Sequence, residues 1–207
     1  MPSDDTPKRG SATPDGNRTR ILRVAERLFA RHGYRDVTVR DIADAAHVTH
    51  PLIYHYFGSK HGLFAAVLEK NQGRMREVAE RSQGGAEEMI ADLIRASVAE
   101  SRTYQLILTR AFAGGMRVSD WPGGFPGIEA TIEALIAELP GRRSASDETR
   151  VRELVVAAIA MLHGWVLLED HLLEMTGLMS EHRDEVRELI VQSMMDVLRP
   201  VLPPGDG

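Results

Sequence analysis

The side chains best suited to chemistry in this sequence lie close together within its first third. His50, Tyr54 and His55 carry ring N–H or hydroxyl donors, and Lys60 adds a positive charge. A ring N–H can donate to an acceptor on the edge of a purine, whereas hydroxyl and ammonium groups bind phosphate oxygens. These residue types, at this spacing, predict contacts with a nucleic acid.

The segment that must position these side chains, residues 38–60, predicts two short helices joined by a tight turn. Thr38 and Asp41 are spaced as a capping box, which marks the start of the first helix. His47 stands in the turn, and Thr49 can cap the second helix. Two short helices in this arrangement are typical of a helix-turn-helix, whose second helix enters the major groove of DNA.

The second short helix has one apolar face for packing and other faces for contact. Ile53 and Phe57 lie four residues apart and predict the buried face. A recognition helix meets base edges with its N-terminal residues. We therefore expect His50 to donate to a base, and Pro51 and Leu52 to make apolar contacts such as one with a thymine methyl group.

Phosphate contacts are expected from residues that surround this helix. Tyr54, His55 and Lys60 are placed for them, although an isolated tyrosine is more often part of a core and a histidine more often an idle surface group. Arg40 could reach either a phosphate or a base. The full set of expected DNA contacts is Arg18, Thr38, Arg40, Thr49, His50, Pro51, Leu52, Tyr54, His55 and Lys60.

The composition is that of an ordinary globular protein. Of its 207 residues, 43% are hydrophobic and 27% are charged, and the absence of cysteine excludes disulfides and thiol catalysis. No apolar run reaches the roughly 18 residues of a membrane span, and the N-terminus lacks the apolar segment of a secretory signal. We therefore expect a cytoplasmic protein with no membrane partner and no cofactor.

Charge is unevenly divided along the chain. The net charge is −5, yet residues 1–60 carry ten Lys/Arg against seven Asp/Glu, whereas the rest carries 15 against 23. A basic first part on an acidic remainder suits a protein that touches phosphates at one end. The same imbalance also describes an ordinary solvated surface.

Helical spacing of apolar residues runs through the whole chain, so the predicted fold class is all-α with about nine helices. We predict a disordered arm over residues 1–16, a helix-turn-helix DNA-binding domain over 17–61 and a helical regulatory and dimerisation domain over 62–202. The first helix is expected to end before Gly33. The helices are expected at 17–32, from 38, from 49 to about 57, from 59, and near 86–101, 103–116, 126–139, 147–177 and 182–199.

Three motifs, L-F-A-R-H-G-Y, V-R-D-I-A and Y-H-Y-F-G-S-K, occur in order within residues 17–64. Together they closely resemble the DNA-binding domain of the tetracycline-repressor (TetR) family. The resemblance implies a homodimeric transcriptional regulator, by family default a repressor, that binds a palindromic operator and carries a C-terminal ligand-binding domain. Beyond residue 68 only the number and placement of helices are similar.

Three residues depart from the family pattern. His47 stands where the family usually has a turn glycine, and that position normally needs φ > 0, so we expect strain there. Pro51 replaces a small or polar residue, and His61 replaces a common acidic one. His47 and Pro51 bear on which operator sequence is read.

Two apolar stripes, along residues 147–177 and 182–199, are the main feature of the C-terminal part. The resemblance implies that they form a four-helix dimer interface, although a monomeric core would show the same spacing. A cavity for a lipophilic or aromatic effector is expected among the middle helices, although each residue alone is more readily explained as core. Its expected lining is Met89, Leu93, Tyr104, Leu108, Phe112, Met116, Trp121, Met161 and Trp165.

Other functions are less well supported by the sequence. It has neither the Glu-x-x-His pairs of helical di-iron proteins nor a G-x-S-x-G element, so we expect no enzyme. Asp170, His171 and Glu174 could bind a metal, but a polar patch is the simpler explanation, as a hydrogen-bonded core histidine is for His163. The alternative to a ligand-responsive regulator is a constitutive or architectural DNA-binding protein without an effector.

Overall fold

A computed structural model describes residues 14–100, 102–139, 144–178 and 180–202. Within these residues every regular element is helical, which confirms the all-α prediction. The α-helices of this part are α1 (Pro14–Asp36), α2 (Val39–Ala46), α3 (His50–Phe57), α4 (Lys60–Arg81), α5 (Gly85–Glu100), α6 (Arg102–Ala113), α7 (Pro126–Glu138), α8 (Ala145–Met175) and α9 (Arg183–Leu198). Its short 3-10 helices are η1 (Val118–Asp120), η2 (Ser180–His182) and η3 (Arg199–Val201).

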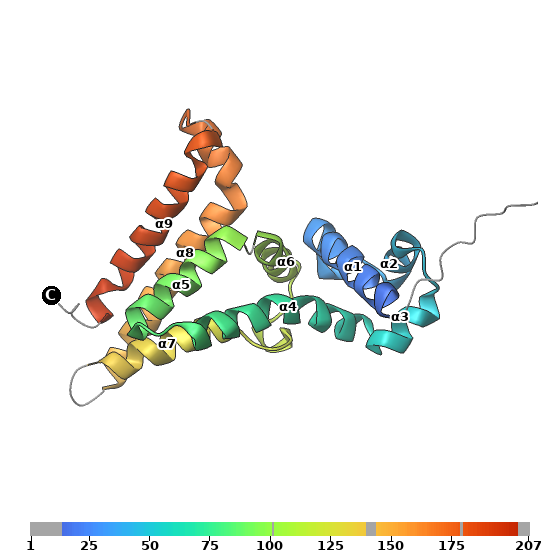
Figure 1. Cartoon of the computed structure of the whole chain (residues 1–207), viewed down its shortest axis with the longest axis horizontal. Helices are drawn as coiled ribbons and strands as arrows, with labels where there is room; N and C mark the ends of the chain where they lie inside the picture. The colour runs from blue at the N-terminus through green and yellow to red at the C-terminus, as the bar shows by residue number, and fades with distance from the viewer. Residues whose placement is uncertain (1–13, 101, 140–143, 179, 203–207) are drawn as a thin grey trace, which may run out of the picture.

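The molecule is elongated, with α1–α3 at one end and α5, α7, α8 and α9 at the other (Figure 1). We call α1–α3 the head and α4–α9 the body. α4 runs from the head along the molecule to α5 and α7, and α6 lies between the two ends and packs against α1. α4 and α6 are therefore the helices that join head and body.

The apolar face of α1 organises the head. Ile21, Ala25 and Phe29 recur at helical spacing and are fully buried. Phe29 meets Phe64 of α4 edge to face, with ring centroids 5.2 Å apart, an arrangement that aromatic pairs favour. The head core therefore continues into the first turns of α4.

Gly33 interrupts α1 where it meets α6. Its φ and ψ are +82° and 165°, a region that only glycine enters without strain. A Cβ at this position would lie 3.5 Å from the Cβ of Arg110 on α6. The first helix therefore ends at Gly33, as the sequence predicts, and a short helical segment follows the kink as far as Asp36.

The predicted capping box at the start of α2 is present. The Thr38 hydroxyl accepts a hydrogen bond from the Asp41 amide at 3.1 Å. Asp41 Oδ2 in turn accepts from the Thr38 hydroxyl at 2.6 Å and from the Thr38 amide at 2.8 Å. These two bonds lower the pKa of Asp41, because they stabilise its charged form.

The turn between α2 and α3 has the conformation that the sequence predicts. His47 lies at φ +51° and ψ +48°, in the left-handed region, and among the described residues it is the one non-glycine with a positive φ. α3 ends at Gly58, and the Ser59 hydroxyl caps α4 by accepting from the Gly62 amide at 2.9 Å. Both expected ends are confirmed.

The far end of the body has a separate core centred on α8. α8 packs against α7 and α9, and its side chains from Val151 to Leu173 contribute to this core. By length and composition α8 could cross a membrane, contrary to the expectation that no segment is long enough. Within the chain only 39% of its most apolar window is buried, so α8 keeps an uncovered apolar face.

The arm predicted over residues 1–16 falls only partly within the described residues. Residues 1–13 lie outside them, whereas residues 14–16 form the first turn of α1, so the helix begins earlier than predicted. α8 also begins earlier, at Ala145, because Ser144 and Asp147 form a capping box that the sequence analysis did not identify.

Candidate functional site

The outer face of α3 carries the side chains expected to read DNA. Ile53 is 1% exposed and holds α3 against the head core, whereas Tyr54 is 44% exposed. The interpretation of Tyr54 as a core residue is therefore wrong. His50 and His55 are exposed as well, and the His50 ring meets the Tyr54 ring edge to face at 5.0 Å.

The N-terminal end of α3 is also open to contact. Thr49 and Pro51 are exposed, and Leu52 is half-buried. Thr49 occupies the N-cap position of α3, but among the described residues its side chain makes no capping hydrogen bond. The prediction that its hydroxyl caps the helix is therefore wrong. The hydroxyl is thus not used by α3 itself.

The two predicted cations beside α3 lie against aromatic rings. The guanidinium carbon of Arg18 is 5.5 Å from the centre of the half-buried Phe57 ring. Lys60 Nζ is 4.4 Å from the centre of the Tyr34 ring and donates to the carbonyl oxygen of Arg35 at 3.3 Å. These contacts turn Lys60 toward the end of α1, and its partial desolvation there lowers its pKa.

The residues at the start of α2 differ in their freedom to bind DNA. Arg40 is exposed, so its guanidinium can move toward a phosphate or a base edge. The single hydroxyl proton of Thr38 is donated to Asp41, and a phosphate contact would have to displace that bond. Thr38 therefore acts first as the cap of the helix.

The polar group on α8 that could have bound a metal is arranged for ion pairs. Asp170 lies 3.1 Å from Arg102 and 2.8 Å from Arg183. Across the described residues no three His, Asp or Glu side chains are placed to hold a metal ion. The arrangement supports the interpretation as a polar patch.

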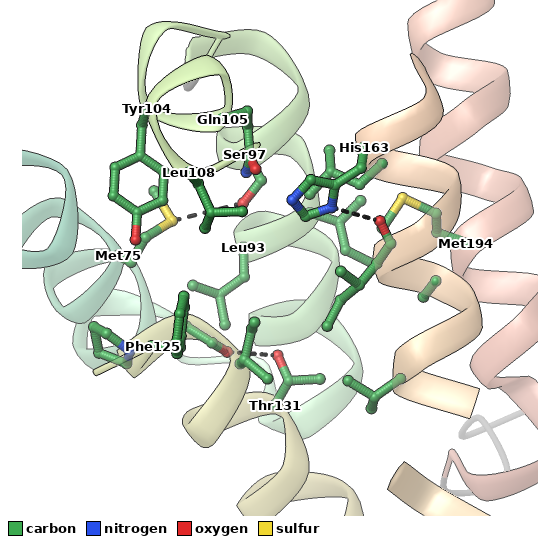
Figure 2. Close-up of a pocket in the computed structure, with 18 of the residues that line it drawn as sticks. Met75, Leu93, Ser97, Tyr104, Gln105, Leu108, Phe125, Thr131, His163 and Met194 are labelled. Atoms are coloured by element: carbon green, nitrogen blue, oxygen red, sulfur yellow. Dashed lines mark hydrogen bonds between the residues drawn. The ribbon is translucent and has the colours of Figure 1, made fainter. Parts of the chain in front are cut away.

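A cavity of about 110 Å³ lies in the body, lined from α4, α5, α6, α7, α8 and α9 (Figure 2). Of the nine residues expected to line it, Leu93, Tyr104 and Leu108 do so. The expectation is wrong for the other six, which pack within or against the two cores: Met89, Phe112, Met116, Trp121, Met161 and Trp165. Helical spacing identifies apolar faces but not which of them border a void, and that is why these six were misplaced.

Several polar residues of the lining were not predicted from the sequence. Ser97, Gln105 and Thr131 all border the cavity, as does His163, which was expected in a core. His163 does have the hydrogen bond expected of a core histidine, from Nδ1 to the Ile159 carbonyl oxygen at 2.8 Å. The sequence did contain one signal for these residues, since each is a polar residue on the inward face of an amphipathic helix.

An apolar surface is left uncovered on α8 and α9. Val156 is 66% exposed and Leu189 is 63% exposed, and Leu168 and Met175 on α8 are exposed as well. Exposed aliphatic side chains of this size on adjacent helices are typical of an interaction surface. They lie on the two helices in which the family resemblance implies a dimer interface.

Comparison with known proteins agrees with this geometry. The sequence model of the tetR family of bacterial regulatory proteins matches residues 21–67. An HTH-type transcriptional repressor of Mycobacterium tuberculosis is 27% identical over 180 residues, which cover 87% of this chain and 88% of that protein. A mycofactocin biosynthesis transcriptional regulator of the same species, so described by its name, is 30% identical over 158 residues, or 72% of this chain and 75% of that protein.

The fold is also shared with solved structures. Salmonella enterica GusR superimposes with a TM-score of 0.61 over 92% of this chain and 97% of that chain, at 19% identity. The matched family segment spans the last part of α1, α2, α3 and the start of α4, which are the elements that build the exposed face of α3. The chain belongs to the TetR family of bacterial transcriptional regulators and is a DNA-binding regulator with a helix-turn-helix head.

Proposed function

We propose that this regulator is a ligand-responsive repressor that binds a palindromic operator as a homodimer. The observation that carries the proposal is the outer face of α3, where His50 and Tyr54 are exposed while Ile53 is buried. These two rings pack against each other and not in the head core, and they stand where a recognition helix meets the groove. Relatives that are named transcriptional repressors support repression, as opposed to activation.

The side chains of the head divide into base and phosphate contacts. His50 donates to a purine acceptor, and Pro51 and Leu52 contact a thymine methyl group. Phosphates are bound by Tyr54 and His55 on α3, and by residues around it: Arg18, Thr38, Arg40, Thr49 and Lys60. The DNA-binding domain then comprises residues 17–61, and residues 62–202 form the regulatory and dimerisation domain.

Dimerisation supplies the second recognition helix. The exposed apolar side chains of α8 and α9, such as Val156 and Leu189, support an interface in which these helices pack against their copies. Two-fold symmetry presents two α3 helices to half-sites about 34–36 Å apart, one turn of DNA. The same covering of α8 explains its apolar surface without a membrane, and we place the protein in the cytoplasm.

Ligand control requires that the cavity and the head be linked. α6 contributes Tyr104 and Leu108 to the cavity wall and, a few residues on, packs Arg110 beside Gly33 of α1. A ligand that prefers a different position of α6 would change the spacing of the two heads. The ligand can lower the affinity for the operator by no more than the ratio of its own affinities for the two conformations, the one that fits the operator and the one that does not.

The test is selection of bound duplexes from a random pool by the purified protein, with its mass in solution measured in parallel. We expect a palindrome with half-sites one helical turn apart and a protein mass of two chains. A non-palindromic site, or a monomer on the selected duplex, would remove the homodimer proposal. A dimer whose operator affinity no ligand changes would identify a constitutive DNA-binding protein.

A further inference from the structure

The cavity in the body is apolar over most of its surface but not over all of it. Several of its polar side chains already have a partner within the protein. The Thr131 hydroxyl donates to the Gly127 carbonyl oxygen at 2.8 Å, and the Ser97 hydroxyl makes a longer contact of 3.7 Å with the sulfur of Met75. Gln72 donates to the carbonyl oxygens of Pro122 and Gly124 at 2.7 and 3.1 Å.

Two buried polar atoms of the lining have no such partner among the described residues. They are Oε1 of Gln105 on α6 and Nε2 of His163 on α8. Gln105 is only 6% exposed, so water outside the protein does not satisfy its amide oxygen. A buried polar atom without a hydrogen bond is costly, and each one in a folded protein requires an explanation.

The hydrogen bond of His163 shows which kind of partner its free nitrogen needs. Nδ1 lies 2.8 Å from the Ile159 carbonyl oxygen, and a carbonyl oxygen can only accept, so Nδ1 carries a proton. In the neutral imidazole the other nitrogen, Nε2, is then an acceptor. Gln105 Oε1 is also an acceptor, so both unpartnered atoms call for a donor.

The two acceptors lie on neighbouring walls of the same space. α6 and α8 pack against each other. Figure 2 shows the Gln105 side chain and the His163 ring toward the same end of the cavity, with Leu93 near its centre and Phe125 and Thr131 beyond. The cavity therefore has one end that accepts hydrogen bonds and an apolar remainder.

The size of the cavity limits the ligand. An engineered apolar cavity of about 150 Å³ binds benzene, so the cavity of about 110 Å³ limits the ligand to one ring at most, with some adjustment of the lining. Met75 and Met194 border it, and methionine side chains adjust readily to the shape of a ligand. A fused polycyclic molecule would need a much larger rearrangement.

From these observations we propose that the effector is a compact, largely apolar molecule with one hydrogen-bond donor, of the phenol class. Its ring occupies the apolar part of the cavity, and its O–H or N–H donates to Gln105 Oε1 or His163 Nε2. This assignment rests on the proposed function in one respect, because it takes the cavity to be the effector site.

The test compares phenol with toluene, in which a methyl group replaces the hydroxyl, and with anisole, which can only accept. Binding to the full chain is followed by NMR of 13C-labelled methionine methyl groups. Met75 and Met194 report on the cavity, and the 80% exposed Met175 serves as an internal control. We expect phenol to shift the two cavity signals at about tenfold lower concentration than toluene or anisole, the effect of about one hydrogen bond.

Variants then assign the donor contact. Gln105→Met and His163→Phe remove the acceptors while retaining bulk, and one of them or both should weaken phenol about tenfold and leave toluene unchanged. Thr131→Val is the matched control, because its hydroxyl is already bonded to Gly127, and it should leave the preference for phenol intact.

Three results would overturn the assignment: equal binding of phenol and toluene, tighter binding of anisole than of phenol, or no shift of either cavity methionine with any of the three. These outcomes are separable from the proposed function. Operator release by a ligand of another class would leave the ligand-responsive repressor in place and remove the phenol class. Selective phenol binding without any effect on operator affinity would support the ligand class and remove the role of the cavity in regulation.

Discussion

Among single residues, His50 has the most specific role in the proposed contact with DNA. It is the first residue of α3, it is exposed, and its ring packs edge to face against the ring of Tyr54. In the proposed contact, replacing His50 with alanine removes one hydrogen-bond donor to a base edge, and a single hydrogen bond contributes about 0.5–1.5 kcal/mol. We expect the preferred base to change at one or two positions in each half-site, as measured by duplex selection with the wild-type protein and the variant.

The control for this prediction is a histidine of similar exposure far from the head. His171 lies exposed on α8, and His171→Ala should leave the selected sequence unaltered. If the wild-type preference also survives His50→Ala, then His50 contributes no sequence information, and reading would pass to Arg40 or to the apolar pair at Pro51 and Leu52.

His47 affects the stability of the fold through its backbone conformation and not through its side chain. A non-glycine residue in the left-handed region costs about 1–2 kcal/mol, whereas glycine costs about 0.5–1 kcal/mol in lost chain freedom. With φ at +51°, His47→Gly should therefore raise the free energy of unfolding by about 0.5–1 kcal/mol in urea denaturation. Ala45→Gly, two residues earlier in α2 and exposed, should instead lower it by about 1 kcal/mol. A loss of stability in both variants would mean that the turn is not strained.

For the elements, the start of α2 depends on one reciprocal pair of side chains. Thr38→Ala removes the hydroxyl that accepts from the Asp41 amide and donates to its carboxylate. We expect the free energy of unfolding at pH 7 to fall by about 1 kcal/mol, the usual cost of losing an N-cap. Urea denaturation of the two proteins measures the difference.

The effect of Thr38 should also depend on pH. The fold lowers the pKa of Asp41, so its charged form stabilises the folded state above the ordinary carboxyl pKa of about 4. This contribution is lost as the pH falls through the lowered pKa. The gap between wild type and Thr38→Ala should therefore narrow below about pH 4, and a gap independent of pH would show that the carboxylate takes no part in the cap.

The ends of the helices show which features of this fold can be predicted from the sequence. Helix starts at Thr38 and Ser59 and the stop at Gly58 were predicted because capping is a local interaction between residues three or four apart. The buried Ile53 and the exposed His50 were predicted for a similar reason, since one short helix has few faces. The orientation of Lys60 toward α1 was not predicted, because its contacts with Tyr34 and Arg35 join segments distant in sequence.

The cavity marks the limit of such prediction. Trp121 and Leu108 are both apolar residues at plausible positions, but Leu108 borders the cavity and Trp121 packs against Phe64 with ring centroids 5.5 Å apart. Which of the two faces a void depends on how the six helices around the cavity pack together. The unpartnered acceptors of Gln105 and His163 could be recognised only once their surroundings were known.

Across the whole molecule, a buried carboxylate joins three helices of the body. Glu169 of α8 is only 3% exposed, and its Oε2 lies 3.2 Å from Arg102 at the start of α6. Its Oε1 lies 2.8 Å from Arg183 and 3.0 Å from Arg187, both on α9. The contacts at Oε1 are close ion pairs but not aligned hydrogen bonds. Because α6 also packs on α1, this cluster lies on the route between the α8–α9 pair and the head.

Glu169→Gln should test how much the cluster stabilises the fold. The change retains size and removes the charge, so three guanidinium groups are left together without their buried partner. Loss of one member of a buried ion pair costs about 3–5 kcal/mol, and because the arginines are partly exposed we expect about 2–3 kcal/mol in urea denaturation. Glu153→Gln is the control on the same helix, since Glu153 and its partner Arg150 are each 59% exposed, and exposed pairs contribute about 0–1 kcal/mol. If the two variants lose equal stability, the cluster around Glu169 is no stronger than a surface pair, and α6 must be held in place by its apolar contacts alone.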